Sequence, residues 1–377
     1  MARETGYYQI LGELHYFIPH SLPPSSPPFE LNADMMDLYG STLFSIGKLN
    51  EIAQKLPNPR RFINAYVIKE ALLSSAIEGI HTTLLDVFTV PLEESYYKFD
   101  KQTQLVINYT KALEAALNLM NKKGMPLVSR VILTAHEALM SGGEGDKASP
   151  GQYRKQPVRV GNLVPPPAHI ILQLMSDLEQ YINNDSDLPP LIRAGLVHVQ
   201  FETIHPFLDG NGRIGRLLIV LMLIDSGLLT VPLLYPSYYF KKYQNEYYQR
   251  LDNVRLKGDF EGWITYYLTT IKESADDAYK RAKAIELLEE HYRQIIISDS
   301  RFSKVQEKSL HVLSMLFESP VTTITYMSKK IDKSYNTTQK IMLLFVEAGI
   351  ITEMTAQLRN KRYQFEAYLQ LLEKDME

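Results

Sequence analysis

The chain is 377 residues long, enough for two or three domains, and its 45% hydrophobic and 22% charged residues are ordinary for a globular protein with a packed core. The absence of cysteine excludes disulfides, zinc–thiolate sites and thiol catalysis, and the formal net charge of −3 argues against a strongly basic coat that binds nucleic acid. The first residues lack the apolar core of a secretory signal, and no apolar run is long enough to span a bilayer. We therefore expect a soluble cytoplasmic protein without a membrane partner.

The N-terminal part is expected to combine an arm with helices. Residues 1–30 include four prolines within positions 20–28, so we predict an irregular, extended surface arm. Leucines and isoleucines at three- and four-residue spacing predict helices over 34–56 and 59–77, within a helical region that we place at 31–110.

The second of these helices ends with a charge in an unfavourable place. Glu78 precedes Gly79, a residue typical of helix ends. A carboxylate near a helix C-terminus opposes the helix dipole. We therefore expect Glu78 to have a cationic partner elsewhere in the chain.

Helical periodicity also predicts helices over 102–122 and 129–140. The latter carries His136, which has no metal-ligand spacing to any other residue and which we interpret as structural. His198, two turns before the end of a later helix, is interpreted in the same way, as packing or support.

A short ribbon is expected among the helices. Val158 and Val160 alternate with Arg159 ahead of the turn residues Gly161 and Asn162, which predicts a small β-hairpin. A plain surface excursion is the alternative interpretation.

The stretch 205–216, which reads HPFLDGNGRIGR, holds more chemistry than a solvated loop needs. A helix predicted over 190–203 ends just before it, and a strongly apolar helix predicted over 213–225 follows. The Gly-Asn-Gly turn between them tolerates positive φ, so its N–H groups can converge on an anion at the N-terminus of the second helix.

The charged side chains of this stretch fit a nucleoside triphosphate. Arg213 and Arg216 are three residues apart on one helix face, so their guanidinium groups can hold two phosphates. Asp209 is a hard oxygen ligand suited to Mg²⁺. His205, with an ordinary pKa of about 6.5, can accept a proton from an attacking hydroxyl near neutral pH. Each residue has a plainer structural interpretation, but no single folding requirement asks for all of them together.

This stretch resembles the signature of the Fic family, enzymes that transfer AMP from ATP to a protein hydroxyl, and it fits the pattern H-x-F-x-D/E-G-N-G-R-x-x-R at every defined position. The resemblance implies a mainly α-helical fold, with an all-helical catalytic core that we place at 111–275. It implies that His205 is the general base, Phe207 a buried anchor and Asp209 the Mg²⁺ ligand. The residues implied to bind ATP are Gly210, Asn211, Gly212, Arg213, Ile214, Gly215 and Arg216.

The same resemblance gives roles to two segments outside the signature. Ser74, Glu78 and Gly79 fit the inhibitory S/T-x-x-x-E-G/N motif of the family, whose glutamate pairs with the second signature arginine, here Arg216, and keeps ATP in a non-productive pose. Alternatively, this glutamate positions water for removal of AMP. The ribbon at 158–161 would be the flap whose edge docks the extended segment of a target protein.

The tyrosine-rich segment 235–251 is where the family's adenosine pocket is expected. Tyr243 and Tyr247, four residues apart, are our candidates for the base pocket, because tyrosine can cover an adenine face and bond ribose. Aromatic residues at helical spacing are more often core, which is the competing interpretation.

The C-terminal part is expected to be a separate module. A charged helix from about 260 to 297 suits a linker at 276–300, and residues 301–377 then resemble a winged helix-turn-helix with 334–347 as the recognition helix. Its wing carries the cations Arg359, Lys361 and Arg362. Residues 301–366 hold ten Lys or Arg against six Asp or Glu, a modest surplus of four for a DNA reader.

Two functions from different classes therefore compete. In the first, the chain adenylylates a hydroxyl side chain of a target protein or of itself, using ATP and Mg²⁺. In the second, it is a DNA-binding regulator that uses the Fic-like core as an ATP sensor. Transfer of phosphate or another nucleotide moiety remains open within the first class. A homodimer, and a DNA or regulatory partner for the C-terminal module, are further expectations.

Overall fold

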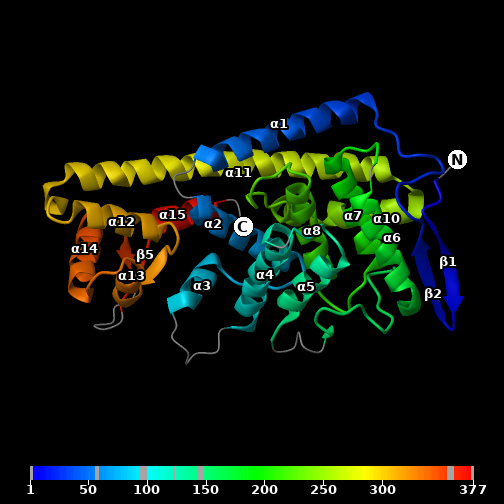
Figure 1. Ribbon diagram of the computed structural model, residues 1–377, viewed down its shortest axis with the longest axis horizontal. Coiled ribbons are helices and arrows are strands. Elements are labelled where there is room, and N and C mark those ends of the chain that lie inside the picture. The colour runs from blue at the N-terminus through cyan, green and yellow to red at the C-terminus, as the bar shows by residue number, and fades with distance from the viewer. Residues whose placement is uncertain are drawn as a thin grey trace.

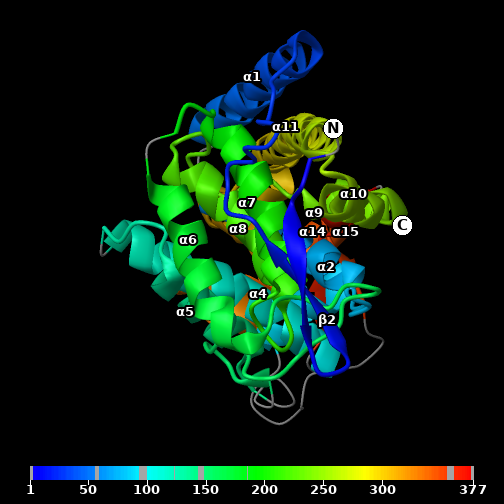
Figure 2. The same ribbon diagram turned by 90° about the vertical axis from the view of Figure 1, so that its right-hand side faces the viewer.

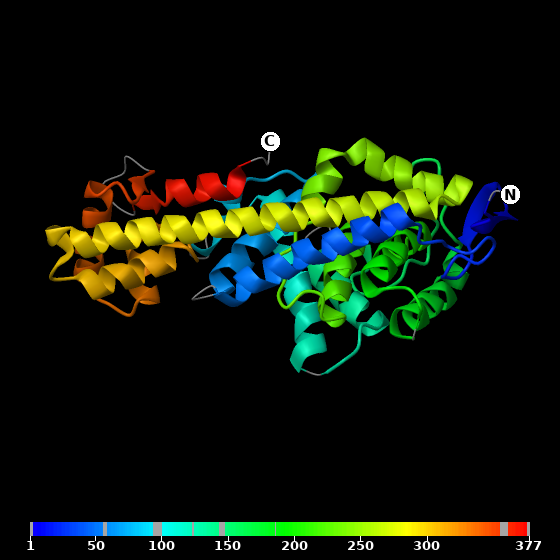
Figure 3. The ribbon, with the colours of Figure 1, turned by 90° about the horizontal axis from the view of Figure 1, so that it is seen from above.

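The computed structural model describes residues 3–55, 59–92, 100–122, 124–142, 148–184, 186–354 and 361–374. The molecule is mainly α-helical and elongated, as Figure 1 shows. Helix α11 (Phe260–Ser298) runs along most of its length, and helix α1 (Ala33–Lys55) lies beside it, in the side view and from above (Figure 3). The predicted mainly helical fold is confirmed.

The helices between α1 and α11 build the body that holds the 205–216 stretch. In chain order they are α2 (Pro59–Ile77), α3 (Leu84–Thr89), α4 (Lys101–Leu117), α5 (Ser129–Met140), α6 (Ile171–Asn183), α7 (Pro190–Ile204), α8 (Asn211–Asp225), α9 (Ser237–Lys242) and α10 (Gln244–Lys257). The helix expected over 102–122 ends as a π-helical turn at Asn118–Lys122, and the tyrosine-rich segment divides at Tyr243 into α9 and α10.

Helices α7 and α8 form the centre of this body. Most residues of α7 and α8 are buried, including the polar Glu202, Arg213 and Arg216, which explains why neither sequence has one apolar and one polar face. The view in Figure 2 shows the two helices surrounded by α4, α5, α6 and α10. The stretch that connects them therefore starts and ends in a rigid core.

The predicted irregular arm is wrong for residues 6–19. Strands β1 (Gly6–Leu11) and β2 (Leu14–Pro19) form an antiparallel hairpin closed by a turn at Gly12, where φ is +64°. The prolines that suggested an arm follow β2, whereas the strands themselves are rich in tyrosine, isoleucine and phenylalanine, which favour β structure.

The expected hairpin at 158–162 is much smaller than predicted. Val160 and Leu163 exchange two backbone hydrogen bonds of 2.9 Å around the Gly161–Asn162 turn, and this single bridge is the whole ribbon. Prolines at 157 and 165–167 flank the bridge and cannot donate to a ladder, so the pairing cannot extend.

The C-terminal part contains helices α12 (Gln306–Leu316), α13 (Ile324–Lys330), α14 (Tyr335–Glu347) and α15 (Glu366–Glu373). A small antiparallel sheet in the order β3-β5-β4 joins Val321–Thr323, Arg362–Gln364 and Thr352–Glu353. Helix α14 lies where the recognition helix was expected, at 334–347, whereas β3 and α15 were not expected. The expected wing tip, including Arg359, lies outside the described residues.

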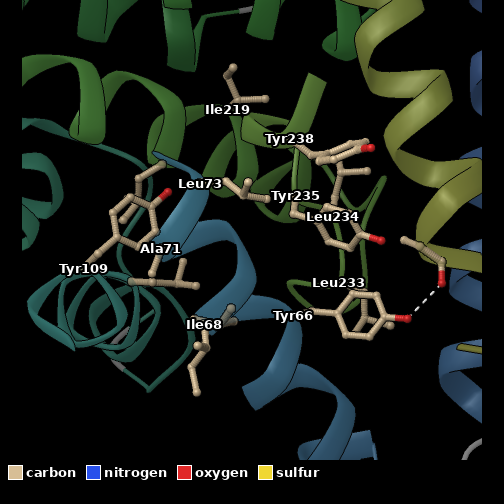
Figure 4. Close-up of a cluster of buried hydrophobic side chains, with 14 of the residues drawn as sticks. Tyr66, Ile68, Ala71, Leu73, Tyr109, Ile219, Leu233, Leu234, Tyr235 and Tyr238 are labelled. Atoms are coloured by element: carbon tan, nitrogen blue, oxygen red, sulfur yellow. Dashed lines mark hydrogen bonds between the residues drawn. The ribbon is translucent and has the colours of Figure 1, made fainter. Parts of the chain in front are cut away.

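This C-terminal part is attached to the body by more than a linker. Helix α11 is continuous across the boundary expected at 275, and its Arg281 donates to the carbonyls of Leu371 and Lys374 at the end of α15. Helix α3 contacts both β3 and α15. In the buried cluster of Figure 4, Tyr66 of α2 lies near Tyr235 and donates to the carbonyl of Ala278 in α11 at 2.9 Å.

Candidate active site

The loop between α7 and α8 begins with a strained residue. His205 ends α7 in the left-handed conformation, with φ +50° and ψ +61°, and its N–H donates to the carbonyl of Phe201 at 2.9 Å. A non-glycine residue in this region is uncommon and costs free energy. Surrounding contacts must therefore hold the loop in place.

Phe207 and Asn211 supply the first of these contacts. The Phe207 ring is fully buried, as expected for an anchor. The Asn211 side chain accepts the N–H of Phe207 at 2.8 Å and donates to the Phe207 carbonyl at 2.9 Å. The amide of Asn211 is thus committed to closing the loop, which leaves only its backbone N–H to contact a phosphate.

His136 of α5 fixes the loop from the other side. Its Nδ1 accepts the N–H of Gly151 at 3.0 Å, so the proton is on Nε2, which donates to the carbonyl of Asp209 at 3.1 Å. The ring stacks on Phe207 with centroids 3.7 Å apart. Burial lowers the pKa of His136 to about 4. The structural interpretation of His136 is confirmed, and its task is to position the site.

Arg154 ties the loop to the segment that carries the Val160–Leu163 bridge. Its side chain donates to the carbonyls of His205 at 2.8 Å and Pro166 at 2.6 Å, and its own N–H donates to the carbonyl of Pro206 at 2.9 Å. Burial lowers the pKa of this guanidinium to about 10. Nothing in the sequence marked this arginine, because its partners are backbone carbonyls contributed by distant segments.

The imidazole of His205 is half-buried. Its Nδ1 has no hydrogen-bond partner among the described residues. Burial lowers its pKa to about 4, against a smaller opposing effect from the backbone of Glu202. The ring is therefore neutral at physiological pH and able to accept a proton.

The Gly-Asn-Gly turn and the first turn of α8 form the expected anion cradle. Gly210 precedes the helix with φ +79°, and a Cβ there would press on Met140 and Leu139. A Cβ on Gly212 would collide with Oε1 of Glu78. The carboxylate of Glu78 therefore lies directly against the N-terminal turn of α8, where the helix dipole favours an anion.

Arg216 connects this carboxylate to α2. Its Nη2 donates to Oε1 of Glu78 at 2.7 Å and to the carbonyl of Ser74 at 2.9 Å, and its Nε donates to Oγ of Ser74 at 2.9 Å. Burial alone would lower the pKa of Arg216, but the charge of Glu78 raises it above its usual value. The expected cationic partner of Glu78 is thus Arg216, with Gly79 (φ +76°) ending the segment.

Arg213 has a different environment. It is buried, and its nearest anion is Oδ1 of Asp209 at 3.6 Å, with Met140 Sδ 3.8 Å from Nη2. Its Nε and Nη1 have no hydrogen-bond partner among the described residues. Burial lowers its pKa. A buried guanidinium with two unpaired nitrogen atoms fits an incoming phosphate.

Asp209 is the acid at the mouth of the cradle. Its side chain is 63% exposed, and Oδ1 accepts the N–H of Gly210 at 2.6 Å. In the described part of the chain no three His, Cys, Asp or Glu residues gather as a metal site. A single carboxylate beside a phosphate cradle fits Mg²⁺, which is usually held by one or two carboxylates together with substrate phosphates and water.

Two buried residues of α7, His198 and Glu202, pack against α8 at Gly215. His198 is bonded to the carbonyl of Gly215 at 2.9 Å and to the hydroxyl of Tyr247 at 2.8 Å, so it acts as support, as expected. Glu202 lies so close to Gly215 that a Cβ there would collide with its Oε1. Burial raises the pKa of Glu202 to about 7. Gly215 therefore contributes close packing, and Ile214 is a buried core residue.

The two tyrosines expected in the base pocket differ in burial. Tyr247 is 1% exposed and its hydroxyl is bonded to His198, so its assignment to an adenine surface is wrong for this structure. Tyr243 is 48% exposed. Tyr248 is 42% exposed and its hydroxyl accepts a hydrogen bond from Gln244. Burial, and to a smaller extent the charge of Glu78, raises the pKa of this hydroxyl. Tyr248 is therefore a better candidate for the base pocket than Tyr247, although four-residue spacing from Tyr243 did not select it.

The predicted docking ribbon is accessible. Arg159 and Gly161 are exposed, and Val158 and Val160 are half-buried. The adjoining Val164 accepts the N–H of Phe17 in β2 at 2.9 Å, which places the N-terminal hairpin beside the ribbon.

The buried helix pair α7 and α8, the strained loop at His205 and the glycine-rich turn at the start of α8 thus lie together in one mainly helical domain. Models of the Fic/DOC family and of its N-terminal region match residues 126–223 and 36–118. Over these two ranges the chain is similar to the Fic/DOC family, and its curated relatives include protein adenylyltransferases named Fic.

Two such relatives come from fruit flies. Protein adenylyltransferase Fic of Drosophila erecta is 31% identical over 208 residues, covering 54% of this chain and 40% of the relative. The Drosophila yakuba protein is 32% identical over the same length, with the same coverage. The chain thus spans about 40% of the length of these curated relatives.

Solved structures share the fold. A Fic family protein from Desulfovibrio desulfuricans superposes with a TM-score of 0.56 at 23% identity, covering 90% of this chain and 98% of that one. A Fic-1 fragment from C. elegans gives a TM-score of 0.52 at 23% identity, covering 66% of this chain and 75% of that one. In the described ranges every helix is too short or too polar to cross a membrane.

Proposed function

We propose that this chain transfers AMP from ATP to a hydroxyl side chain of a protein, and that Glu78 holds the site in an inactive state. Two groups beside the N-terminus of α8 carry the proposal: the neutral imidazole of His205, whose Nδ1 has no hydrogen-bond partner among the described residues, and the buried guanidinium of Arg213, whose Nε and Nη1 have none there either. One group can accept a proton and the other can bind phosphate. The family match supplies the reaction class.

In the proposed reaction His205 accepts the proton of a Tyr, Thr or Ser hydroxyl. The hydroxyl oxygen forms a bond to the α-phosphorus while the bond from that phosphorus to the bridging oxygen breaks, and pyrophosphate leaves. The N-terminal turn of α8 and Arg213 hold the phosphates, so catalysis is chiefly positioning and charge neutralisation. Mg²⁺, when held by Asp209, neutralises charge on the phosphate oxygens.

The inactive state follows from the place of Glu78. Its carboxylate lies against Gly212 and bonds to Arg216, both of which the outer phosphates of ATP would contact. Two anions cannot share this space, so productive ATP has to displace Glu78. Because α2 is held along its length by α4, α9 and the Tyr66 bond to α11, we propose that its last turn moves rather than the helix as a whole.

Mass spectrometry after incubation with ATP and Mg²⁺ tests the proposal. The Glu78→Gly variant should gain the mass of one AMP on a hydroxyl side chain of itself or of an added protein. The double variant that also carries His205→Ala should gain none, while still binding ATP. AMP transfer that persists without His205, or its absence from Glu78→Gly with a range of target proteins, would contradict the assignment.

The C-terminal part favours a second role, as a module that binds DNA or a regulatory partner. The proposal is supported by three helices, α12 to α14, and an antiparallel sheet in the order β3-β5-β4, which are the kinds of element that a winged helix contains. The start of α14 exposes Lys333, Tyr335 and Asn336, with Lys340 one turn further on. Salt-dependent binding of labelled duplex DNA, weakened by Lys333→Ala and unaffected by His205→Ala, would support DNA as this partner. Binding to neither DNA nor protein would remove this role.

A further inference from the structure

The N-terminal hairpin ends the molecule with an uncovered strand. Figure 1 shows β1 as the outermost element at this end, with β2 between it and the helical body. Its side chains are apolar and exposed on both faces: Tyr7 51%, Tyr8 58%, Ile10 61% and Leu11 41%. Scattered apolar residues are normal on a surface, but four within five positions of one strand are not.

The backbone of the same strand is also unpaired along its outer edge. The carbonyl of Thr5 accepts the N–H of His20, and the register pairs Tyr7 with Ile18, so these odd-numbered positions point toward β2. In an antiparallel pair the alternate residues point away, which places the N–H and C=O groups of Gly6, Tyr8 and Ile10 outward. In the described part of the chain β1 has no second neighbour.

Protein sheets normally protect such an edge. Lysine or another charge on the strand, proline or a bulge are the usual devices. Residues 5–12, TGYYQILG, contain none of the first two, and the register from Gly6 to Leu11 is continuous. The edge is therefore suited to pairing with another strand.

We propose that this strand is β1 of a second copy of the chain, paired antiparallel about a two-fold axis at Tyr8. In that register Tyr8 faces Tyr8 of the partner subunit, so the outward backbone groups of the two strands meet. Such an interface is self-complementary and closes at two copies. It joins the molecules end to end, on the side of the hairpin away from the Val160–Leu163 ribbon.

Side chains select this register and this occupant. In this register no charged residue within positions 4–12 faces an apolar one, because Gly6 of each strand lies opposite Ile10 of the other and Glu4 lies opposite Gly12. A shift of two residues one way puts Glu4 opposite Ile10. The opposite shift places Gly6 opposite Gly12, so that no side-chain contact forms at this pair. The strand thus complements itself in one register only.

The interface consists of one six-residue strand, so the dimer should be weak and should depend on protein concentration. The chain has no cysteine, so a single introduced cysteine reports on the pairing without background. Tyr8→Cys should give a disulfide-linked dimer under mild oxidation, since facing residues of antiparallel strands lie within reach of a disulfide. Leu11→Cys is the matched control, because Leu11 is exposed on the same strand but in the proposed register faces position 5 of the second copy, six residues from position 11 there.

Charge at the axis gives a second test. Tyr8→Lys and Tyr8→Glu should each be monomeric in sedimentation experiments, because like charges meet across the axis. An equimolar mixture should restore a dimer that contains one of each. Equal crosslinking of Tyr8→Cys and Leu11→Cys, a wild-type dimer that both charge variants retain, or a wild-type monomer at every accessible concentration would overturn the proposal. None of these readouts depends on AMP transfer.

Discussion

Two arginines of α8, one turn apart, have opposite environments. Arg216 is saturated by Ser74 and Glu78 from α2. Arg213 is equally buried, yet its Nε and Nη1 have no hydrogen-bond partner among the described residues, and its ion-pair neighbour there is the exposed carboxylate of Asp209. The inner end of the cradle, at Arg216, is thus occupied by the carboxylate of Glu78. The outer end, at Arg213, has nitrogen atoms that could bind a phosphate.

This difference is what the proposed inhibition by Glu78 rests on. Glu78 lies far from the 205–216 stretch in sequence but against Gly212 in space, so His205 and its loop already have their positions while Glu78 occupies the N-terminal turn of α8. Under the proposed function, displacement of the last turn of α2 would therefore be sufficient for activity, without rearrangement of α7 or α8.

Removing the carboxylate should have the largest effect. We expect Glu78→Gly to raise AMP transfer roughly 5- to 150-fold, from a coupling of about 1–3 kcal/mol between inhibitory contact and nucleotide. Glu78→Gln should give a smaller increase, since it keeps the shape of the side chain and loses only the charge. Transfer of labelled AMP from ATP measures both.

Glu347→Gly provides a matched control, because it also removes a glutamate near a helix C-terminus, in α14. It should leave AMP transfer unchanged. If Glu78→Gly behaves in the same way, the filled inner end is a structural ion pair and not an inhibitory one.

The two arginines should also differ in what they do for stability. Arg216→Met removes three hydrogen bonds and leaves Glu78 unpaired, so we expect a loss of about 1–3 kcal/mol in the free energy of unfolding. Arg213→Met replaces a buried, unsaturated cation by an apolar side chain of similar length, and should be neutral or stabilising.

Thermal unfolding with and without ATP distinguishes the two effects. Both variants should lose the stabilisation that ATP confers, whereas only Arg216→Met should unfold earlier without nucleotide. Equal destabilisation by both substitutions would mean that Arg213 has a partner within the protein and is not kept for phosphate.

The sequence predicted the parts of this site that are local. The twelve-residue stretch between two apolar helices defined the cradle, and the C-terminal position of Glu78 indicated that it needed a cation. Contacts made by backbone carbonyls could not be predicted, because they depend on tertiary packing. Arg154 binds the carbonyls of His205 and Pro166, and any basic residue before the ribbon would have looked the same.

The errors have similar causes. The Pro-rich segment 20–28 dominated the interpretation of residues 1–30, although the β-forming residues precede it. Tyr243 and Tyr247 were chosen by helical spacing, and the N–H of Tyr247 does donate to the carbonyl of Tyr243 across the first turn of α10, but Tyr243 is exposed at the helix start whereas Tyr247 is buried. Tyr247 is buried and therefore cannot cover an adenine ring. Periodicity could not predict this, because tyrosines occupy both the buried and the exposed face of this helix.

Buried titratable groups around the cradle should make stability depend weakly on pH. Burial lowers the pKa values of His136 and His205 to about 4 and of His198 to about 3, below the usual 6.5. Between pH 4.5 and 6.5 the unfolded chain therefore binds about three more protons at these sites, which makes stability rise with pH. Burial raises the pKa values of Glu70 and Glu202 to about 7, so the folded chain binds about two more there, with the opposite sign.

The net difference is about one proton, so stability should increase with pH by about 1.4 kcal/mol per unit over this window. Single substitutions should change the slope in opposite directions. His198→Gln removes one histidine contribution and should flatten the dependence, whatever it does to stability at any single pH. Glu202→Gln removes an opposing contribution and should roughly double it. Unfolding midpoints measured from pH 4.5 to 6.5 test both predictions. If Glu202→Gln leaves the slope unchanged, the carboxyl of Glu202 is ionised beside Arg216 in the folded protein. It would then be a second internal anion, next to Glu78, at the inner end of the cradle.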